Sequence, residues 1–123
     1  MDRQELTAAR AGLVPGDRAA LGALIKASVR AFAEQSPGHA VELRVPPHIA
    51  VQCIDGPRHT RGTPPNVVEL DAGTWLDVAT GALNWQDAVD DGRISASGPR
   101  SDLSAYLPLP DQEPDREPDQ ENA

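Results

Sequence analysis

Residues 67–107 constrain the fold of this chain more than any other stretch, because helix and strand signals alternate there and each has its own stop signal. Asp71 follows a short apolar run and can cap a helix. Gly81 supplies a residue that turns left-handed easily where that helix must end. Asn84 opens a second short helix, and Gly92 closes it. The stretch therefore predicts a strand followed by two short helices.

A further strand is predicted at residues 93–97, where Ile94 and Ala96 share one side and Gly98-Pro99 ends the alternation. A final helix is expected between that stop and Leu107. Local signals that agree with each other over one segment are typical of a sequence that specifies a single fold.

The chain before residue 67 contains one long amphipathic helix and two strands. Residues 16–35 carry a single apolar stripe at helical spacing. Its members are Leu21, Leu24, Ile25, Val29 and Phe32. Residues 41–45 alternate as a half-buried strand does, and residues 48–54 are apolar on both faces, which predicts a central strand. The first dozen residues form a short helix or no ordered element.

The carboxyl-terminal residues differ in charge from the rest. The 123-residue chain has a formal net charge of −8. Residues 111–123 contain six acidic residues and a single basic one, Arg116, so most of the net negative charge lies in this segment. With no apolar residue except Ala123, such a segment cannot offset the entropy cost of ordering. We expect a partly ordered segment over residues 1–15, one α+β domain over 16–109 and a disordered acidic tail over 110–123.

Composition excludes several classes of function. The acidic balance argues against nucleic-acid binding, which needs a basic face. The single cysteine, Cys53, alternates with apolar neighbours and is predicted to be buried. The histidines lack metal-ligand spacing, so no metal site is expected. No cofactor is expected either. No apolar run is long enough to span a bilayer. We expect a soluble cytoplasmic protein without stable membrane insertion.

Several motifs resemble the sterol-carrier-protein-2-like fold, and in particular its small bacterial sterol carrier branch. They are ELRVPP (42–47), AVQCIDGPRHTRGTPPNVVEL (50–70), Trp75, Gly81, Trp85, Ala88 and GRISASG (92–98). The resemblance implies a twisted, mainly antiparallel five-stranded sheet covered by helices, with an apolar tunnel between them. In relatives that tunnel takes up sterols or fatty acyl chains, and the fold also occurs as an accessory domain.

The loop between residues 58 and 66 is the candidate binding segment. Arg58, His59 and Arg61 lie within four residues of each other, and arginine forks suit a carboxylate or phosphate. The alternative is that these arginines only pair with nearby acids and hold the loop. Asn66 lies at the exit of the loop. A short strand within this segment is also possible on the sequence alone.

The leading functional hypothesis is a non-catalytic lipid-binding module. Its apolar ligand, a fatty acyl or sterol-like molecule, would lie among Leu24, Phe32 and Trp75, with the cationic loop holding an anionic head group. A second hypothesis is a protein-interaction or accessory domain with a solid core that uses the loop to contact a protein partner. A third is an enzyme on a small acidic substrate with His59 as acid/base; no other catalytic residue is predicted.

Overall fold

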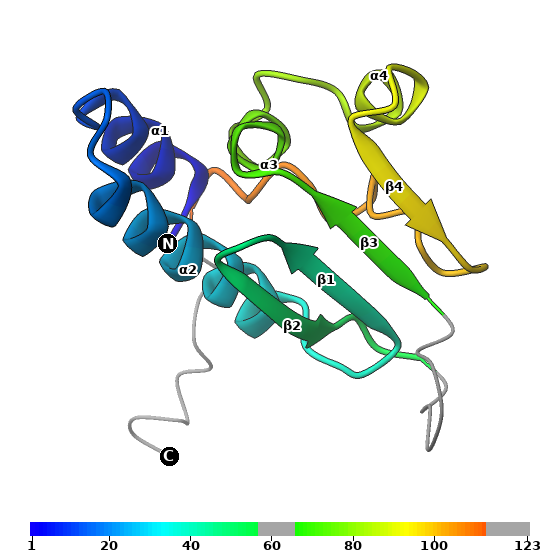
Figure 1. Cartoon of the computed structure of the whole chain (residues 1–123). Coiled ribbons are helices and arrows are strands. Elements are labelled where there is room, and N and C mark those ends of the chain that lie inside the picture. Colours follow the sequence, from blue (N-terminus) through cyan, green and yellow to red (C-terminus); the bar gives the residue numbers. More distant parts are fainter. Residues whose placement is uncertain (57–65, 113–123) are drawn as a thin grey trace, which may run out of the picture.

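The computed structural model describes residues 1–56 and 66–112, which form four helices and four strands (Figure 1). In chain order the elements are α1 (Arg3–Ala11), α2 (Arg18–Gln35), β1 (Val41–Val45), β2 (Ile49–Cys53), β3 (Val67–Leu70), α3 (Ala72–Thr80), α4 (Trp85–Asp90) and β4 (Ile94–Ser97). The α+β class and the order of elements up to β4 agree with the expectation from the sequence.

Each helix begins at a side chain that satisfies free backbone N–H groups. Asp2 and Glu5 form a reciprocal capping box at α1, so the first residues form a helix, one of the two outcomes left open by the sequence. Asp17 caps α2 by accepting from the backbone N–H of Ala20 at 3.0 Å. Asp71 and Asn84 cap α3 and α4 as predicted.

The sheet is mixed, with strand order β2-β1-β3-β4. β1 pairs with β2 in antiparallel register from Val41↔Cys53 to Val45↔Ile49, and β3 pairs with β4 antiparallel. β1 and β3 run parallel, with Leu43 opposite Val68. Two of the three pairings are therefore antiparallel, in agreement with the expected mainly antiparallel sheet.

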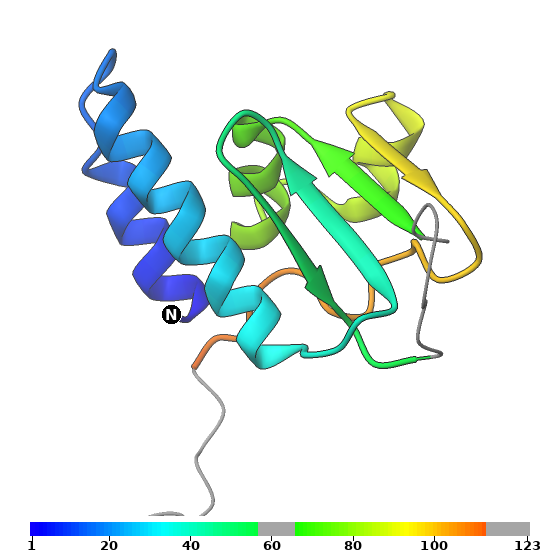
Figure 2. The same ribbon diagram turned by 60° about the horizontal axis from the view of Figure 1, so that its bottom comes forward.

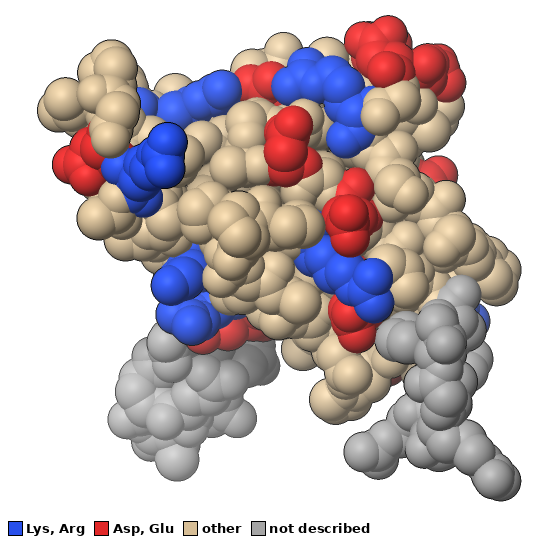
Figure 3. Space-filling model, viewed as in Figure 1, with Lys and Arg blue, Asp and Glu red and all other residues tan. Residues whose placement is uncertain are grey.

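Helices cover one face of this sheet and leave the other open (Figure 2). Register places the buried side chains of Val41, Leu43 and Val68 on one face, where α2 and α3 contribute Ile25, Phe32 and other core residues. On the opposite face Arg44 donates to Glu42 at 2.6 Å, and charges of both signs lie over it (Figure 3). The long amphipathic helix α2 thus packs along the edge strand β2 and buries its predicted stripe.

Two expectations about the strands need correction. The described residues form four strands rather than five; the segment in which a further strand was considered possible, residues 58–66, lies outside the described residues except for Asn66. β2 was predicted to be central but is an edge of the described sheet. Its inward side chains are covered by α2, whereas the outward Ala50 and Gln52 are exposed.

The final helix expected near Leu107 does not form. The described chain makes only a turn there, in which the N–H of Tyr106 donates to the carbonyl of Leu103 at 2.9 Å. Pro108 and Pro110 lack N–H donors, and a residue before proline disfavours helical backbone. Buried Leu103, Leu107 and Leu109 instead anchor an extended segment against the helical side.

An ion cluster joins α1, α3 and the start of β4. Asp77 on α3 accepts from Arg10 and from Arg93 at 2.7 Å each, and Arg93 also donates to the Thr74 hydroxyl at 3.1 Å. Partial burial alone would raise the pKa of Asp77, but the hydrogen bonds and charges of Arg93 and Arg10 outweigh it and lower the pKa. The carboxylate therefore stabilises the folded chain in its ionised form.

We expect Asp77→Asn to lower the free energy of unfolding by about 1 kcal/mol at pH 7, because all three partners are partly exposed. A carboxyl with a lowered folded-state pKa stabilises above its unfolded pKa of about 3.9 and loses this effect as pH falls through the folded value. Urea unfolding of both proteins should therefore show a gap at pH 7 that closes toward pH 3. A gap that stays constant with pH would contradict the role of the ionised form.

Candidate functional site

A half-open pocket lies where the carboxyl end of α3, the start of α4 and the carboxyl-terminal segment meet. Its volume is about 350 Å³. We call it the α3–α4 pocket, and its lining residues are Arg3, Val78, Gly81, Leu83, Asn84, Trp85, Gln86, Ser104, Leu107 and Pro108. Side chains from α1, α3, α4 and the carboxyl-terminal segment thus meet in one hollow.

Local structure explains how these elements reach the pocket. Gly81 ends α3 with φ +83°, a left-handed conformation that favours glycine. A Cβ atom there would lie 3.5 Å from Pro108 Cγ and 3.7 Å from Arg3 Nη1, so the missing side chain leaves room in the pocket. The N–H of Leu109 donates to the carbonyl of Ala79 at 3.0 Å and holds the carboxyl-terminal segment against α3.

The pocket combines apolar walls with one cation. Val78, Trp85 and Leu107 are buried and provide the apolar lining. Arg3 brings a guanidinium group that pairs with Asp111, and the Arg3 backbone N–H donates to Pro110 at 2.8 Å. The lining also includes the polar side chains of Asn84, Gln86 and Ser104, and such a mixed hollow with a cation suits a small molecule that has an apolar part and an anionic end.

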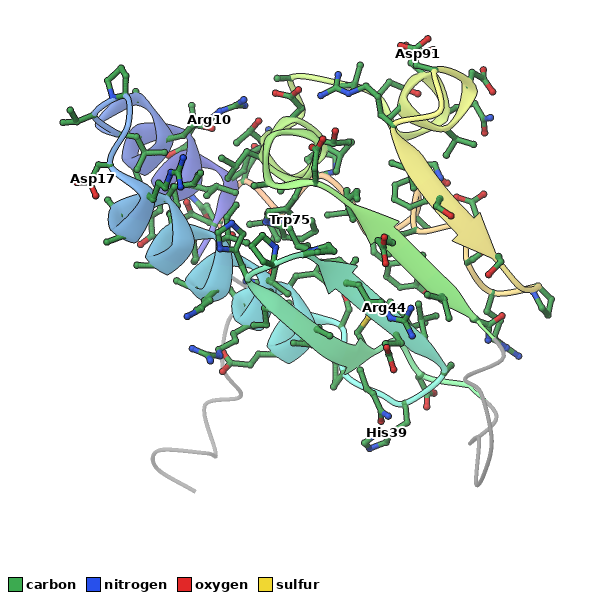
Figure 4. All side chains as sticks on the ribbon, in the orientation of Figure 1. Arg10, Asp17, His39, Arg44, Trp75 and Asp91 are labelled. Atoms are coloured by element: carbon green, nitrogen blue, oxygen red, sulfur yellow. The ribbon has the colours of Figure 1, made fainter. Side chains whose placement is uncertain are left out.

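The apolar residues predicted as ligand contacts lie in the core. Trp75 on α3 is fully buried, and its indole N–H donates to the Ser28 hydroxyl on α2 at 2.9 Å. Its ring meets Phe32 edge to face at a centroid separation of 5.7 Å. Leu24 is also buried and lies on α2, the helix that carries Phe32. Trp75 points between the helices and the sheet (Figure 4), so the structure brings these residues together, away from the α3–α4 pocket.

Asn66 lies in the interior and has structural partners on both sides. Its amide donates to the Ala40 carbonyl at 2.7 Å, and its side-chain oxygen accepts from the Arg100 N–H at 2.8 Å. It therefore links the start of β1 to the chain that follows β4. The other loop residues predicted to bind an anion, Arg58, His59 and Arg61, lie outside the described residues.

Within residues 1–56 and 66–112, no group of three or more His, Cys, Asp or Glu side chains is placed to hold a metal ion. Cys53 is buried as predicted, and desolvation by burial raises the pKa of its thiol to about 12. A thiol with this pKa is protonated at neutral pH and is a poor nucleophile. Across the same ranges, no helix is long and apolar enough to cross a membrane.

Sequence reasoning missed most of the α3–α4 pocket. On the sequence, Trp85 stands out as part of the family resemblance, and in the structure it lines this pocket. Arg3, Leu83 and Pro108 gave no signal, because they come from separate elements whose approach depends on tertiary packing. Two lining residues, Gly81 and Asn84, did give local signals, but these were assigned only to the end of α3 and the beginning of α4.

The state of Cys53 gives a direct prediction. In the folded protein at pH 8, we expect iodoacetamide to modify Cys53 no faster than the chain opens, because the thiol is buried and protonated. Mass spectrometry should show the rate rising with urea in parallel with unfolding. Rapid modification without denaturant would contradict the buried, protonated state.

The family model described as bacterial SCP ortholog matches residues 17–109, which is three quarters of the chain. The matched range includes every lining residue of the α3–α4 pocket except Arg3. None of the curated proteins matches the sequence.

Proposed function

Because this chain belongs to the bacterial sterol carrier protein family, we propose that it binds a small apolar ligand with an anionic end and does not catalyse a reaction on it. The α3–α4 pocket is the binding site in this proposal. Its combination of buried apolar walls with the Arg3 guanidinium is the observation that supports it.

The size of the pocket limits the ligand. At about 350 Å³ it is near the lower end of the range of small-molecule sites, about 300–1,000 Å³. Burying about eight methylene groups would return roughly 6 kcal/mol before the cost of association. An apolar chain of that length therefore needs the contact with Arg3, or further apolar area outside the pocket, to bind well.

The site expected from the sequence is the alternative location. There the ligand would lie among Leu24, Phe32 and Trp75, with the head group on the loop containing Arg58, His59 and Arg61. The three apolar side chains are buried in contact with the core, so a ligand would have to displace them. This location remains a prediction.

A second candidate function is that of a protein-interaction or accessory domain. The close packing of Phe32 on Trp75 favours it, since the region between α2 and α3 is filled by side chains. Its proposed contact surface is the loop from Arg58 to Asn66. Asn66 holds the end of that loop through Ala40 and Arg100.

Filling the pocket tests the main proposal. We expect Leu83→Trp to weaken binding of a fluorescent fatty acid about tenfold or more, because the larger side chain occupies the α3–α4 pocket. Leu13→Trp is the matched control: Leu13 is also partly buried, but it lines a different hollow of about 390 Å³ between α1 and α2. Equal affinities in the two variants would contradict the α3–α4 site.

The two tryptophans distinguish the two locations. In a Trp85→Phe variant, the remaining Trp75 reports on the core, and in a Trp75→Phe variant Trp85 reports on the pocket. Fluorescence changes on fatty-acid addition confined to Trp85 support the proposal. Changes confined to Trp75 support the site predicted from the sequence. If neither tryptophan responds and mass spectra of the purified protein show no bound ligand, the results support the interaction domain.

Neutralising Asp111 should strengthen the binding of an anionic ligand. Asp111→Asn removes the carboxylate that pairs with Arg3, so we expect carboxylate affinity to rise about two- to fivefold, the effect of an exposed pair. Asp91→Asn, an exposed substitution with the same change in charge at the residue that follows α4, is the control. Calorimetric titration of a fatty acid measures both. No gain in Asp111→Asn beyond the control would exclude Arg3 as the head-group contact.

A further inference from the structure

The outward face of α2 forms a long shallow groove that the proposed ligand site does not use. Its volume is about 560 Å³. We call it the α2 groove, and it is lined by Arg18, Ala19, Gly22, Ala23, Lys26, Ala27, Arg30 and His48. The floor consists of small side chains, and no acidic residue lines it.

Within the described part of the chain, the groove gathers most of the basic side chains that have no ion pair. Of the eight Lys and Arg residues in residues 1–56 and 66–112, four form salt bridges within that part of the chain. Three of the remaining four, Arg18, Lys26 and Arg30, line the α2 groove; the fourth is Arg100. Basic side chains appear over the α2 side of the molecule in Figure 3, separated by uncharged surface. In a chain of net charge −8, such a concentration indicates an anionic occupant.

The three cations of the α2 groove are separated along the helix axis by multiples of four residues. Lys26 and Arg30 are four residues apart, and Arg18 and Lys26 are eight apart. With a rise of about 1.5 Å per residue, their backbone positions are about 6 Å and about 12 Å apart. A complementary anionic chain should therefore carry charges at multiples of about 6 Å.

The acidic end of the same chain has this spacing. Residues 113–123 read EPDREPDQENA, and their acids occupy every second position from Glu113 to Glu121. Pro114 and Pro118 disfavour helical backbone, and in β-like extended backbone the side chains at alternate positions share one side. Such residues are about 6.6 Å apart, close to the axial spacing of about 6 Å between Lys26 and Arg30.

The described chain ends where this segment can reach the groove. Asp111 pairs with Arg3 at the amino end of α1, and the Gln35 side chain at the carboxyl end of α2 donates to Met1 at 2.7 Å. The helices lie side by side, and the end of the described chain lies near the carboxyl end of α2 (Figure 2). Eleven further residues can span about 36 Å when extended, whereas α2 from Gln35 back to Arg18 covers about 26 Å.

We propose that residues 113–123 dock in the α2 groove of the same molecule and run antiparallel to α2. The acids at every second position of this segment then face Arg30, Lys26 and Arg18. The contact is electrostatic and buries little apolar surface, so it does not require the segment to fold on its own. Covalent attachment supplies the high effective concentration that lets several weak exposed pairs act together. The concave floor fits a narrow peptide better than a flat bilayer.

Amide NMR of the full chain and of a variant ending at Gln112 tests the proposal. We expect truncation to shift the amide signals of the groove residues, including Ala23 and Ala27, and a synthetic 113–123 peptide added to the truncated protein to restore the shifts. Salt at about 1 M should abolish the contact, because the Debye length falls to about 3 Å. A peptide of the same composition with its five acids consecutive tests the spacing and should restore the shifts less completely.

Charge reversal locates the contact. Lys26→Glu should abolish the effect of the peptide, whereas Arg100→Glu, a charge reversal at a cation that lies outside the groove and has no ion pair within the described residues, should leave it intact. Far-ultraviolet circular dichroism checks that both variants fold. The proposal is overturned if truncation leaves the α2 signals unmoved, or if Lys26→Glu and Arg100→Glu behave alike. Fatty-acid binding by the α3–α4 pocket is a separate readout that neither result decides.

Discussion

The contact on which the arrangement of helices depends is that of Trp75 with α2. Its indole ring is fully buried against Phe32, and its N–H is satisfied by the Ser28 hydroxyl, which itself donates to the Leu24 carbonyl at 2.8 Å. A buried indole without a partner for its N–H would lose a hydrogen bond in an apolar environment. Ser28 thus fixes where α3 meets α2, and the position of α3 decides where its carboxyl end, and hence the α3–α4 pocket, lies.

A second buried hydrogen-bonding residue performs a similar role at the other end of the sheet. Asn66 uses both ends of its amide, toward Ala40 before β1 and toward Arg100 after β4. Three segments distant in sequence are therefore held at one point. This demand explains why an asparagine, which has both a donor and an acceptor, occupies a buried position immediately before β3.

The features predicted well from the sequence are those with a local physical cause. Asp71, Asn84 and Gly81 act through backbone groups a few residues away, so their roles could be inferred without knowledge of tertiary contacts. The final helix was predicted wrongly because the burial of Leu103 and Leu107 against distant elements is not visible in the local sequence. The α3–α4 pocket escaped prediction for the same reason: Arg3 and Pro108 are at opposite ends of the described chain and meet only after folding.

The carboxyl-terminal segment connects the two surfaces for which functions are proposed. Leu107 and Pro108 line the α3–α4 pocket, and three residues later Asp111 pairs with Arg3, which lines the same pocket. An anionic head group at Arg3 competes with Asp111 for the same guanidinium, whereas the cations of the α2 groove lie on another helix face and contact none of the pocket lining. Occupation of the pocket can therefore weaken the attachment of the chain at Asp111, two residues before the proposed docking segment, without altering the groove itself. Arg3 can thus couple the binding of an anionic ligand in the α3–α4 pocket to the attachment of the carboxyl-terminal segment through Asp111.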